Sequence, residues 1–187
     1  MPQTIDISRR NFIKTGLVGA ATLATTPAFA WPSLQNHKMK ELAFHNLHTD
    51  ERLRVTFWKK NNFDYSALAK INHILRDFRT GETYPIATNL ITLLHDLQGH
   101  LGTDVPVEII SGYRSPKTNA TLAQKSGGVA KRSLHMQGLA TDIRMSGISL
   151  RKVRNEALLM RRGGVGFYPD SNFVHVDVGR VRKWGAA

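Results

Sequence analysis

The stretch SLHMQGLATDIRM, from Ser133 to Met145, decides how the rest of the chain is interpreted. Its second half alternates in polarity and predicts a β-strand that places Asp142 on one face and Ile143 on the other. His135 stands shortly before this strand. Gly138 lies between them, and glycine tolerates backbone bends that other residues avoid. We therefore expect the chain to turn at Gly138 and to bring His135 back beside Asp142.

A second alternating stretch, FVHVDVG, begins at Phe173. Val174 and Val176 would share the face that packs on the core, whereas His175 and Asp177 would share the opposite face. Two such positions are about 7 Å apart along a strand. The pattern predicts an imidazole and a carboxylate that point toward the same region of the sheet surface.

Two histidines and one carboxylate are the smallest ligand set for a catalytic zinc ion, which keeps one position for water. Zinc lowers the pKa of that water to about 7, so that hydroxide is available at neutral pH. The chain has no cysteine, so a transition metal would depend on histidine and carboxylate ligands. Spacing alone also fits another interpretation, in which His135 is a capped histidine of a loop, Asp142 belongs to a turn and His175 is a strand residue at the sheet edge.

The N-terminal stretch SRRNFIKTGLVGAATLATTPAFAW has the layout of an export signal: a basic head, a short apolar middle and a small-x-small end. The paired Arg9 and Arg10, with Phe12 after them, resemble the twin-arginine signal. We expect cleavage after Ala30 and a periplasmic protein of residues 31–187. The apolar run is shorter than the roughly 20 residues that span a bilayer, so no membrane span is expected in the mature chain.

The formal net charge of +12 indicates which kinds of molecule could bind this protein. Such an excess favours polyanions, which include nucleic acid, acidic lipid and acidic cell-wall polymers. A solvated basic surface without a special partner is the other interpretation. A nucleic-acid-binding module shows no recognisable motif here and conflicts with export, so we expect no nucleic acid partner. No oligomeric state is predicted.

The chain beyond the signal predicts one α+β domain with an antiparallel sheet flanked by helices. Two strands surround a polar turn in residues 41–58, and helical spacing runs from an N-cap at Asp64 to Gly81. A second helix is expected from Thr88. Further elements follow in order: a strand in residues 105–113, a short helix in 118–126, the strand of Asp142, a helix capped by Ser149, and two strands around 169–172.

Three segments carry a family resemblance. The pattern Ser133-x-His135-x-x-Gly138-x-Ala140-x-Asp142 resembles the SxHxxGxAxD signature of the zinc peptidases that include D-Ala-D-Ala dipeptidases, D,D-carboxypeptidases and the hedgehog signalling domain. ISGYRS, with Arg114, precedes it. GGVGFYPDSNFVHVDVGRVRKW resembles one branch, the twin-arginine-exported murein endopeptidases of the MepK type. The resemblance implies a hedgehog and D-Ala-D-Ala-peptidase-like fold, with zinc bound by His135, Asp142 and His175.

Peptide hydrolysis also requires a base, and Asp177 shares the strand face of His175, while the resemblance implies a role for Arg114. Asp177 is the first candidate for the base that takes a proton from the metal-bound water, and Asp170 is the second. Alternatively, Asp177 orients a ligand histidine. Arg114 would stabilise the oxyanion or hold a substrate carboxylate, unless it only ties down its turn. Ser133 is expected to form hydrogen bonds within the site and not to act as a nucleophile.

The implied activity is zinc-dependent hydrolysis of peptide cross-links in peptidoglycan, with links between two meso-diaminopimelate residues as one candidate. Peptidoglycan stem peptides carry free carboxylates, which suits the basic composition. Two alternatives keep the same fold. One is a carboxypeptidase that acts on stem peptides, and the other is a zinc-bearing protein that binds the wall without cleaving it.

The export signal gives a direct prediction. Because the arginine pair is what the twin-arginine system reads, Arg9→Lys together with Arg10→Lys should leave uncleaved precursor in the cytoplasm. Immunoblots of cell fractions measure this. Normal amounts of processed protein in the periplasm would refute twin-arginine export.

Overall fold

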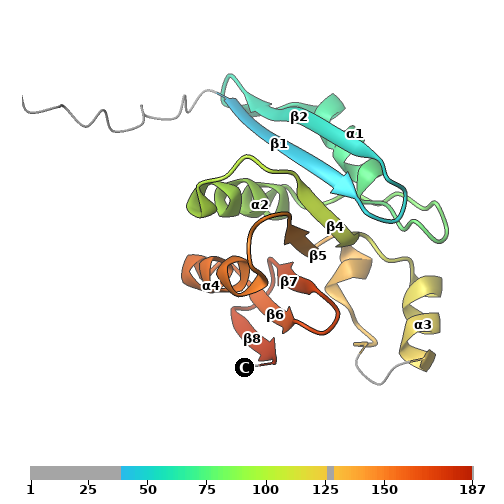
Figure 1. The fold of residues 1–187 in the computed structure, drawn as a ribbon. Helices are drawn as coiled ribbons and strands as arrows, with labels where there is room; N and C mark the ends of the chain where they lie inside the picture. The colour runs from blue at the N-terminus through green and yellow to red at the C-terminus, as the bar shows by residue number, and fades with distance from the viewer. Residues whose placement is uncertain (1–38, 126–128, 187) are drawn as a thin grey trace, which may run out of the picture. The chain divides into compact units, whose positions relative to one another are not determined.

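The computed structural model describes residues 39–125 and 129–186, which form four α-helices, one 3-10 helix and one eight-stranded sheet (Figure 1). The twin-arginine segment and the cleavage site after Ala30 lie outside the described residues. The strands are β1 (Met39–Asn46), β2 (Arg52–Lys59), β3 (Asn62–Phe63), β4 (Val107–Ser111), β5 (Ala140–Met145), β6 (Gly164–Tyr168), β7 (Phe173–Asp177) and β8 (Arg182–Gly185). The helices are α1 (Tyr65–Ile74), α2 (Thr88–Leu101), α3 (Pro116–Lys125), the 3-10 helix η1 (Leu134–Gln137) and α4 (Leu150–Met160).

The sheet is mixed but mostly antiparallel, with the strand order β3-β2-β1-β4-β5-β7-β6-β8. The predicted α+β class is confirmed. The predicted antiparallel sheet is confirmed in part, because most strand pairs are antiparallel, whereas β1 pairs with β4 and β6 pairs with β8 in parallel. The first parallel pair arises because the chain carries α1 and α2 between β1 and β4.

Helix α1 begins where the sequence predicts and ends earlier. The Asp64 carboxylate caps it by accepting a hydrogen bond from the backbone of Ala67. Its last carbonyls bond to other elements, since Asn46 Nδ2 donates to the oxygen of Ile74 at 2.9 Å and the Tyr113 amide donates to that of Leu75 at 2.7 Å. Tertiary partners thus end a helix whose apolar spacing continues further along the sequence.

Helices α2 and α4 build the core on the sheet. The start of α2 at Thr88 and the capping of α4 by Ser149 are as predicted. Helix α4 packs against β5, β6 and β7, and also against α2. The predicted inward side chains of α2 are all buried, namely Leu90, Ile91, Leu94, Leu97 and Leu101.

The two faces of the central strands have different roles. Ile143, Val174 and Val176 are buried in the hydrophobic core with the apolar side of α4. The residues that alternate with them, Asp142 and His175, therefore point to the other face of the sheet. That face carries the polar groups described below.

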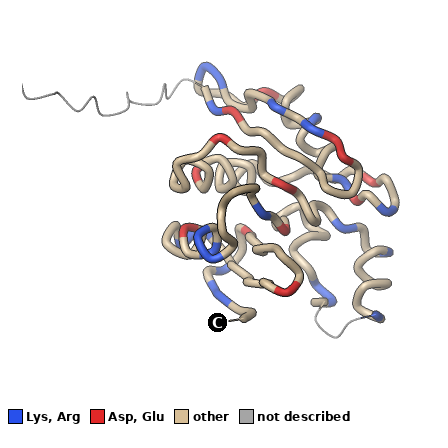
Figure 2. Tube along the Cα trace, viewed as in Figure 1, with Lys and Arg blue, Asp and Glu red and all other residues tan. Residues whose placement is uncertain are grey.

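Basic side chains are spread over several elements. Figure 2 shows Lys and Arg on the β1–β2 hairpin, on α4 and around β8, with fewer Asp and Glu among them. Exposed examples are Lys60, Arg151, Arg161, Arg180 and Lys183. The positive charge is therefore a property of much of the described surface. No helix in the described ranges is both long and apolar enough to cross a membrane.

The residue just before β6, Gly163, approaches the end of β7 so closely that a side chain does not fit there. A Cβ atom added at Gly163 would lie 1.7 Å from the backbone oxygen of Asp177. We predict that Gly163→Ala destabilises the protein by about 1–3 kcal/mol, because the backbone of β6 or β7 must shift. Urea unfolding followed by circular dichroism measures the change.

Gly99→Ala is the matched control, since Gly99 is exposed in α2 and a Cβ atom there meets nothing within 4 Å. This control should stabilise the protein by about 0.5–1 kcal/mol through helix propensity. Equal stability of the two variants would contradict the close approach at Gly163.

Candidate metal centre

His135 is held in place by a short 3-10 helix that is fixed at both ends. Ser133 precedes η1, and its hydroxyl accepts a hydrogen bond from the His135 amide at 3.3 Å. Gly138 ends η1 in the left-handed conformation, with φ of 65°. A Cβ atom at Gly138 would lie 2.2 Å from the carbonyl oxygen of Pro85, so the position requires glycine. The predicted turn at Gly138 and the hydrogen-bonding role of Ser133 are both present.

Asp142 and His175 face one another across neighbouring strands. Strands β5 and β7 pair in antiparallel register, with Asp142 opposite His175 and Ala140 opposite Asp177. Directly paired residues direct their side chains to the same face, so the register brings this carboxylate and imidazole together.

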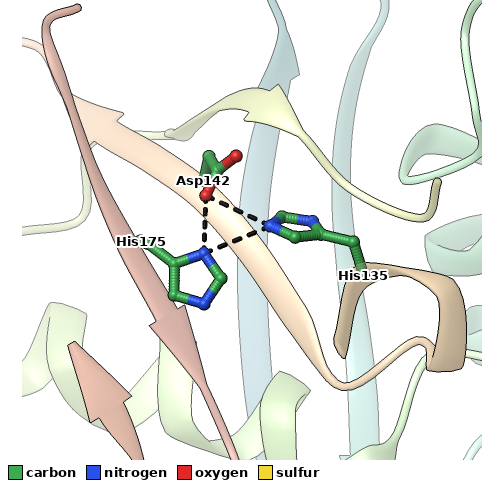
Figure 3. Close-up of side chains that lie close together, drawn as sticks. All are labelled: His135, Asp142 and His175. Atoms are coloured by element: carbon green, nitrogen blue, oxygen red, sulfur yellow. Dashed lines mark hydrogen bonds and ion pairs between the residues drawn. The ribbon is translucent and has the colours of Figure 1, made fainter. Parts of the chain in front are cut away.

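The three side chains converge on one point (Figure 3). His175 Nδ1 lies 2.8 Å from Asp142 Oδ1 and 3.1 Å from His135 Nε2, and His135 Nε2 lies 3.3 Å from Asp142 Oδ1. His135 and Asp142 are 3% and 6% exposed. Within the described part of the chain, this is the group of His, Asp and Glu side chains that could hold a metal ion.

The outer nitrogens of both imidazoles are occupied by hydrogen-bond acceptors. His135 Nδ1 lies 2.8 Å from the carbonyl oxygen of Gly112, and His175 Nε2 lies 3.2 Å from Asp177 Oδ2. An oxygen that only accepts requires the hydrogen to be on the nitrogen, which assigns the tautomer of each neutral ring. The inner nitrogens then carry lone pairs. Two nitrogen lone pairs and a carboxylate oxygen therefore meet, an arrangement that requires a shared proton or a cation.

The electrostatics of the group favour positive charge at its centre. Burial alone would raise the pKa of Asp142, but His135 and His175 outweigh it and hold the pKa well below its ordinary value. Burial acts to lower the pKa of His175, and the hydrogen bonds to Asp142 and Asp177 reverse this, so the pKa is raised. The negative charge of Asp142 and Asp177 favours a proton on His175. The same charge would favour a metal ion bound at the inner nitrogen of His175.

Asp177 supports His175 and lies behind it. The Asp177 side chain is fully buried, and its Oδ1 accepts from the backbone amides of Gly164 and Gly179 at 2.9 and 2.8 Å. Arg182 donates to both carboxylate oxygens, at 3.2 Å to Oδ1 and 2.8 Å to Oδ2. Burial would raise the pKa of Asp177, but these bonds and the one from His175 hold it well below its ordinary value.

Two roles were considered for Asp177, a catalytic base and a carboxylate that orients His175, and its contacts favour the second. A base needs a free lone pair that faces the reacting water and a pKa near neutrality. Asp177 has both oxygens engaged and does not line the cavity beside the group. Its position instead suits a carboxylate that orients a ligand histidine. Asp170, the second candidate base, is exposed in the turn between β6 and β7, and the structure does not bring it to the group.

Arg114 lies beside the group, as the sequence suggested. Its Nη2 is 3.6 Å from Asp142 Oδ2, and its backbone amide donates to the carbonyl oxygen of His135 at 3.2 Å. The side chain is 12% exposed, and its buried Nε has no hydrogen-bond partner among the described residues. The guanidinium is thus incompletely satisfied by the protein and borders the cavity.

A cavity of about 470 Å³ opens onto the group. Arg114 and Arg132 line it on the side of η1, and an aromatic wall of Tyr168, Phe173 and Trp184 lines it on the side of β6, β7 and β8. Arg182 also lines the cavity and lies over the Trp184 ring, so the cavity combines cationic and aromatic side chains. This composition suits an extended ligand with carboxylate groups and apolar segments.

Strand β8 is the part of the site that sequence reasoning missed. It supplies Arg182 to Asp177, and Trp184 to the cavity wall. A Cβ atom at Gly166 would lie 2.7 Å from the Trp184 ring, so the indole occupies the space that a side chain would fill. The alternation of large residues at 182 and 184, with small residues at 164 and 166, was the available signal.

Comparison with known proteins gives a consistent result. The profile of the family described as Peptidoglycan L,D-endopeptidase MepK matches residues 34–184, and that of the twin-arginine translocation pathway signal sequence matches residues 6–26. The chain is 44% identical over 180 residues to the Peptidoglycan L,D-endopeptidase MepK of Escherichia coli (strain K12), with 96% of this chain and 98% of the relative covered. It is 38% identical over 181 residues to the Probable peptidoglycan L,D-endopeptidase MepK of Haemophilus influenzae, with 96% and 97% covered.

Proposed function

The chain belongs to the family of peptidoglycan L,D-endopeptidases described as MepK, and from this membership we propose that His135, Asp142 and His175 hold a zinc ion used to cleave peptide cross-links. The protein is a peptidoglycan hydrolase, and its N-terminal signal directs it through the twin-arginine route to the periplasm. We assign residues 1–30 to the signal and residues 31–187 to the zinc peptidase domain.

The convergence of three lone-pair donors is the observation that carries the zinc assignment. Zinc takes imidazole nitrogen and carboxylate oxygen at about 2.0–2.2 Å in a tetrahedron, so two ligand atoms lie roughly 3.3 Å apart. The three separations of 2.8, 3.1 and 3.3 Å are close to that value. With three protein ligands, the site keeps a position for water or substrate, as catalytic zinc sites do.

When bound, zinc would act as a Lewis acid and make hydroxide available near neutral pH. The protein's own residues prepare the ligands for it. Gly112 and Asp177 hold the outer ring hydrogens of His135 and His175, so both inner nitrogens are free to coordinate. Arg114 would hold a substrate oxygen at the edge of the group and stabilise a developing negative charge there, a role that its distance from Asp142 and its position on the cavity wall support.

Two finer assignments concern the fold and the substrate. We infer that the fold is the one shared by D-Ala-D-Ala peptidases and the hedgehog domain, since the SxHxxGxAxD pattern spans η1, its Gly138 cap and β5. We also infer that the substrate is the stem peptide, because its free carboxylates suit the basic surface and the arginines of the cavity. Links between two meso-diaminopimelate residues are the favoured target.

The metal assignment predicts about one zinc ion per purified chain. His135→Ala, Asp142→Ala and His175→Ala should each abolish stoichiometric zinc, because two ligands remain. Asp177→Asn should weaken zinc binding by about 10–100-fold, as loss of a group that orients a ligand does. Chelator competition measures the affinity, and exposed Asp170→Asn is the control that should bind normally. Full zinc affinity with lost hydrolysis in Asp177→Asn would restore Asp177 as the base.

The activity is tested on purified, cross-linked muropeptides incubated with the zinc-loaded mature chain and analysed by mass spectrometry. New uncross-linked monomers are expected, and Asp142→Ala should produce none. Release of a terminal D-Ala in their place would indicate a carboxypeptidase. An unchanged mixture, with the muropeptide bound, would identify a wall-binding protein that does not cleave.

A further inference from the structure

The aromatic wall of the cavity contains a hydroxyl group that is held in a fixed position. Trp184 Nε1 lies 2.7 Å from the Tyr168 hydroxyl oxygen. The Tyr168 ring stacks on Phe173, with the ring centroids 4.6 Å apart and the planes 25° apart. Tyr168 and Phe173 are also paired in the register of β6 and β7. Both the ring and the hydroxyl of Tyr168 are thus positioned before any ligand enters.

The hydrogen-bond roles in this pair are determined by chemistry. An indole N–H only donates, so the Tyr168 oxygen accepts from Trp184. The hydroxyl hydrogen of Tyr168 is then left to donate elsewhere. Within residues 39–125 and 129–186, the Tyr168 hydroxyl has no other hydrogen-bond partner. A half-buried donor therefore remains for water or for a ligand.

This donor belongs to the same cavity as the candidate metal ligands. Gly166 is in register with His175 on one side and with Trp184 on the other. The Trp184 and His175 rings are 5.1 Å apart. Tyr168 lies two residues beyond Gly166 on the same face of β6, and it lines the cavity together with His135, Asp142 and His175.

We propose that the Tyr168 hydroxyl donates a hydrogen bond to an oxygen atom of the bound peptide, and that Trp184 aims it. The assignment rests on the proposed function, since it takes a peptide beside the metal group as the ligand. Peptide carbonyls and carboxylates are acceptors without hydrogens of their own, so a donor aimed in advance binds them without a cost of reorganisation. Arg114 lines the same cavity and would contact the same ligand.

Tyr168→Phe removes this donor and keeps the ring that stacks on Phe173. Zinc content and the unfolding midpoint should stay at wild-type values, while kcat/KM on cross-linked muropeptides should fall by about tenfold or more, as expected when a buried ligand oxygen loses its hydrogen-bond donor. A smaller fall overturns the proposal. Tyr84→Phe is the matched control: Tyr84 is 41% exposed and does not line the cavity, so its kcat/KM should be unchanged.

A double-mutant cycle with Trp184→Phe tests whether the indole aims the hydroxyl. Loss of indole packing affects both backgrounds equally, whereas loss of the Trp184 to Tyr168 hydrogen bond matters only where the hydroxyl is present. Trp184→Phe should therefore lower kcat/KM more in the wild-type background than in Tyr168→Phe, with zinc content verified in each variant. Equal effects in the two backgrounds would show that Trp184 does not act through Tyr168.

Calorimetry with the zinc-loaded protein separates this proposal from the proposed function. If the wild-type chain binds a cross-linked muropeptide without hydrolysing it, the endopeptidase assignment fails. The proposal for Tyr168 is then tested by comparing the dissociation constants of the wild type and of Tyr168→Phe. A several-fold weaker binding in Tyr168→Phe then supports the donor role. An unchanged dissociation constant in that case overturns it.

Discussion

The pairing of Asp142 with His175 across β5 and β7 is the constraint on which the site depends. A slip of one residue would move every side chain of one strand to the other face of the sheet. The carboxylate would then enter the hydrophobic core, and Ile143 would replace it in the cavity. The valines of β7 prevent such a slip, because they must stay against α4 and the core. Packing on the apolar face of the sheet thereby sets the strand register, and the register in turn sets the positions of the polar side chains on the opposite face.

Burial of Asp177 and His135 is tolerated because each is bonded to groups that are themselves fixed. Asp177 accepts from two backbone amides, one arginine and one imidazole, so a buried carboxylate keeps its charge. His135 is held through a backbone carbonyl and a helix cap. The ligand atoms are therefore preorganised by the fold, which lowers the conformational entropy lost when a cation binds.

The sequence predicted those elements that depend on local patterns. It did not predict contacts that depend on the pairing of strands far apart in the sequence. The faces of β5 and β7, the turn at Gly138 and the start of α2 follow from periodicity and glycine geometry. Residue spacing alone did not decide between a metal site and ordinary polar residues, and only the family signature favoured the metal site. The surroundings of Asp177 were not predicted, because Arg182 comes from β8, whose pairing with β6 was indicated only by the large residues at 182 and 184 and the small residues at 164 and 166. The early end of α1 has the same origin, since its last carbonyls bond to β1 and to the turn after β4.

The strands at the two ends of the sheet also affect how copies of the protein behave toward one another. An open sheet edge offers unpaired amides and carbonyls to any neighbouring chain, and proteins guard against fibre-like association with short or charged edge strands. One edge here is β3, with only two residues. The other is β8, a strand of four residues that carries the exposed charge of Lys183. Like charges would repel a second β8, so the strand that steadies the cavity also protects the folded protein against self-association.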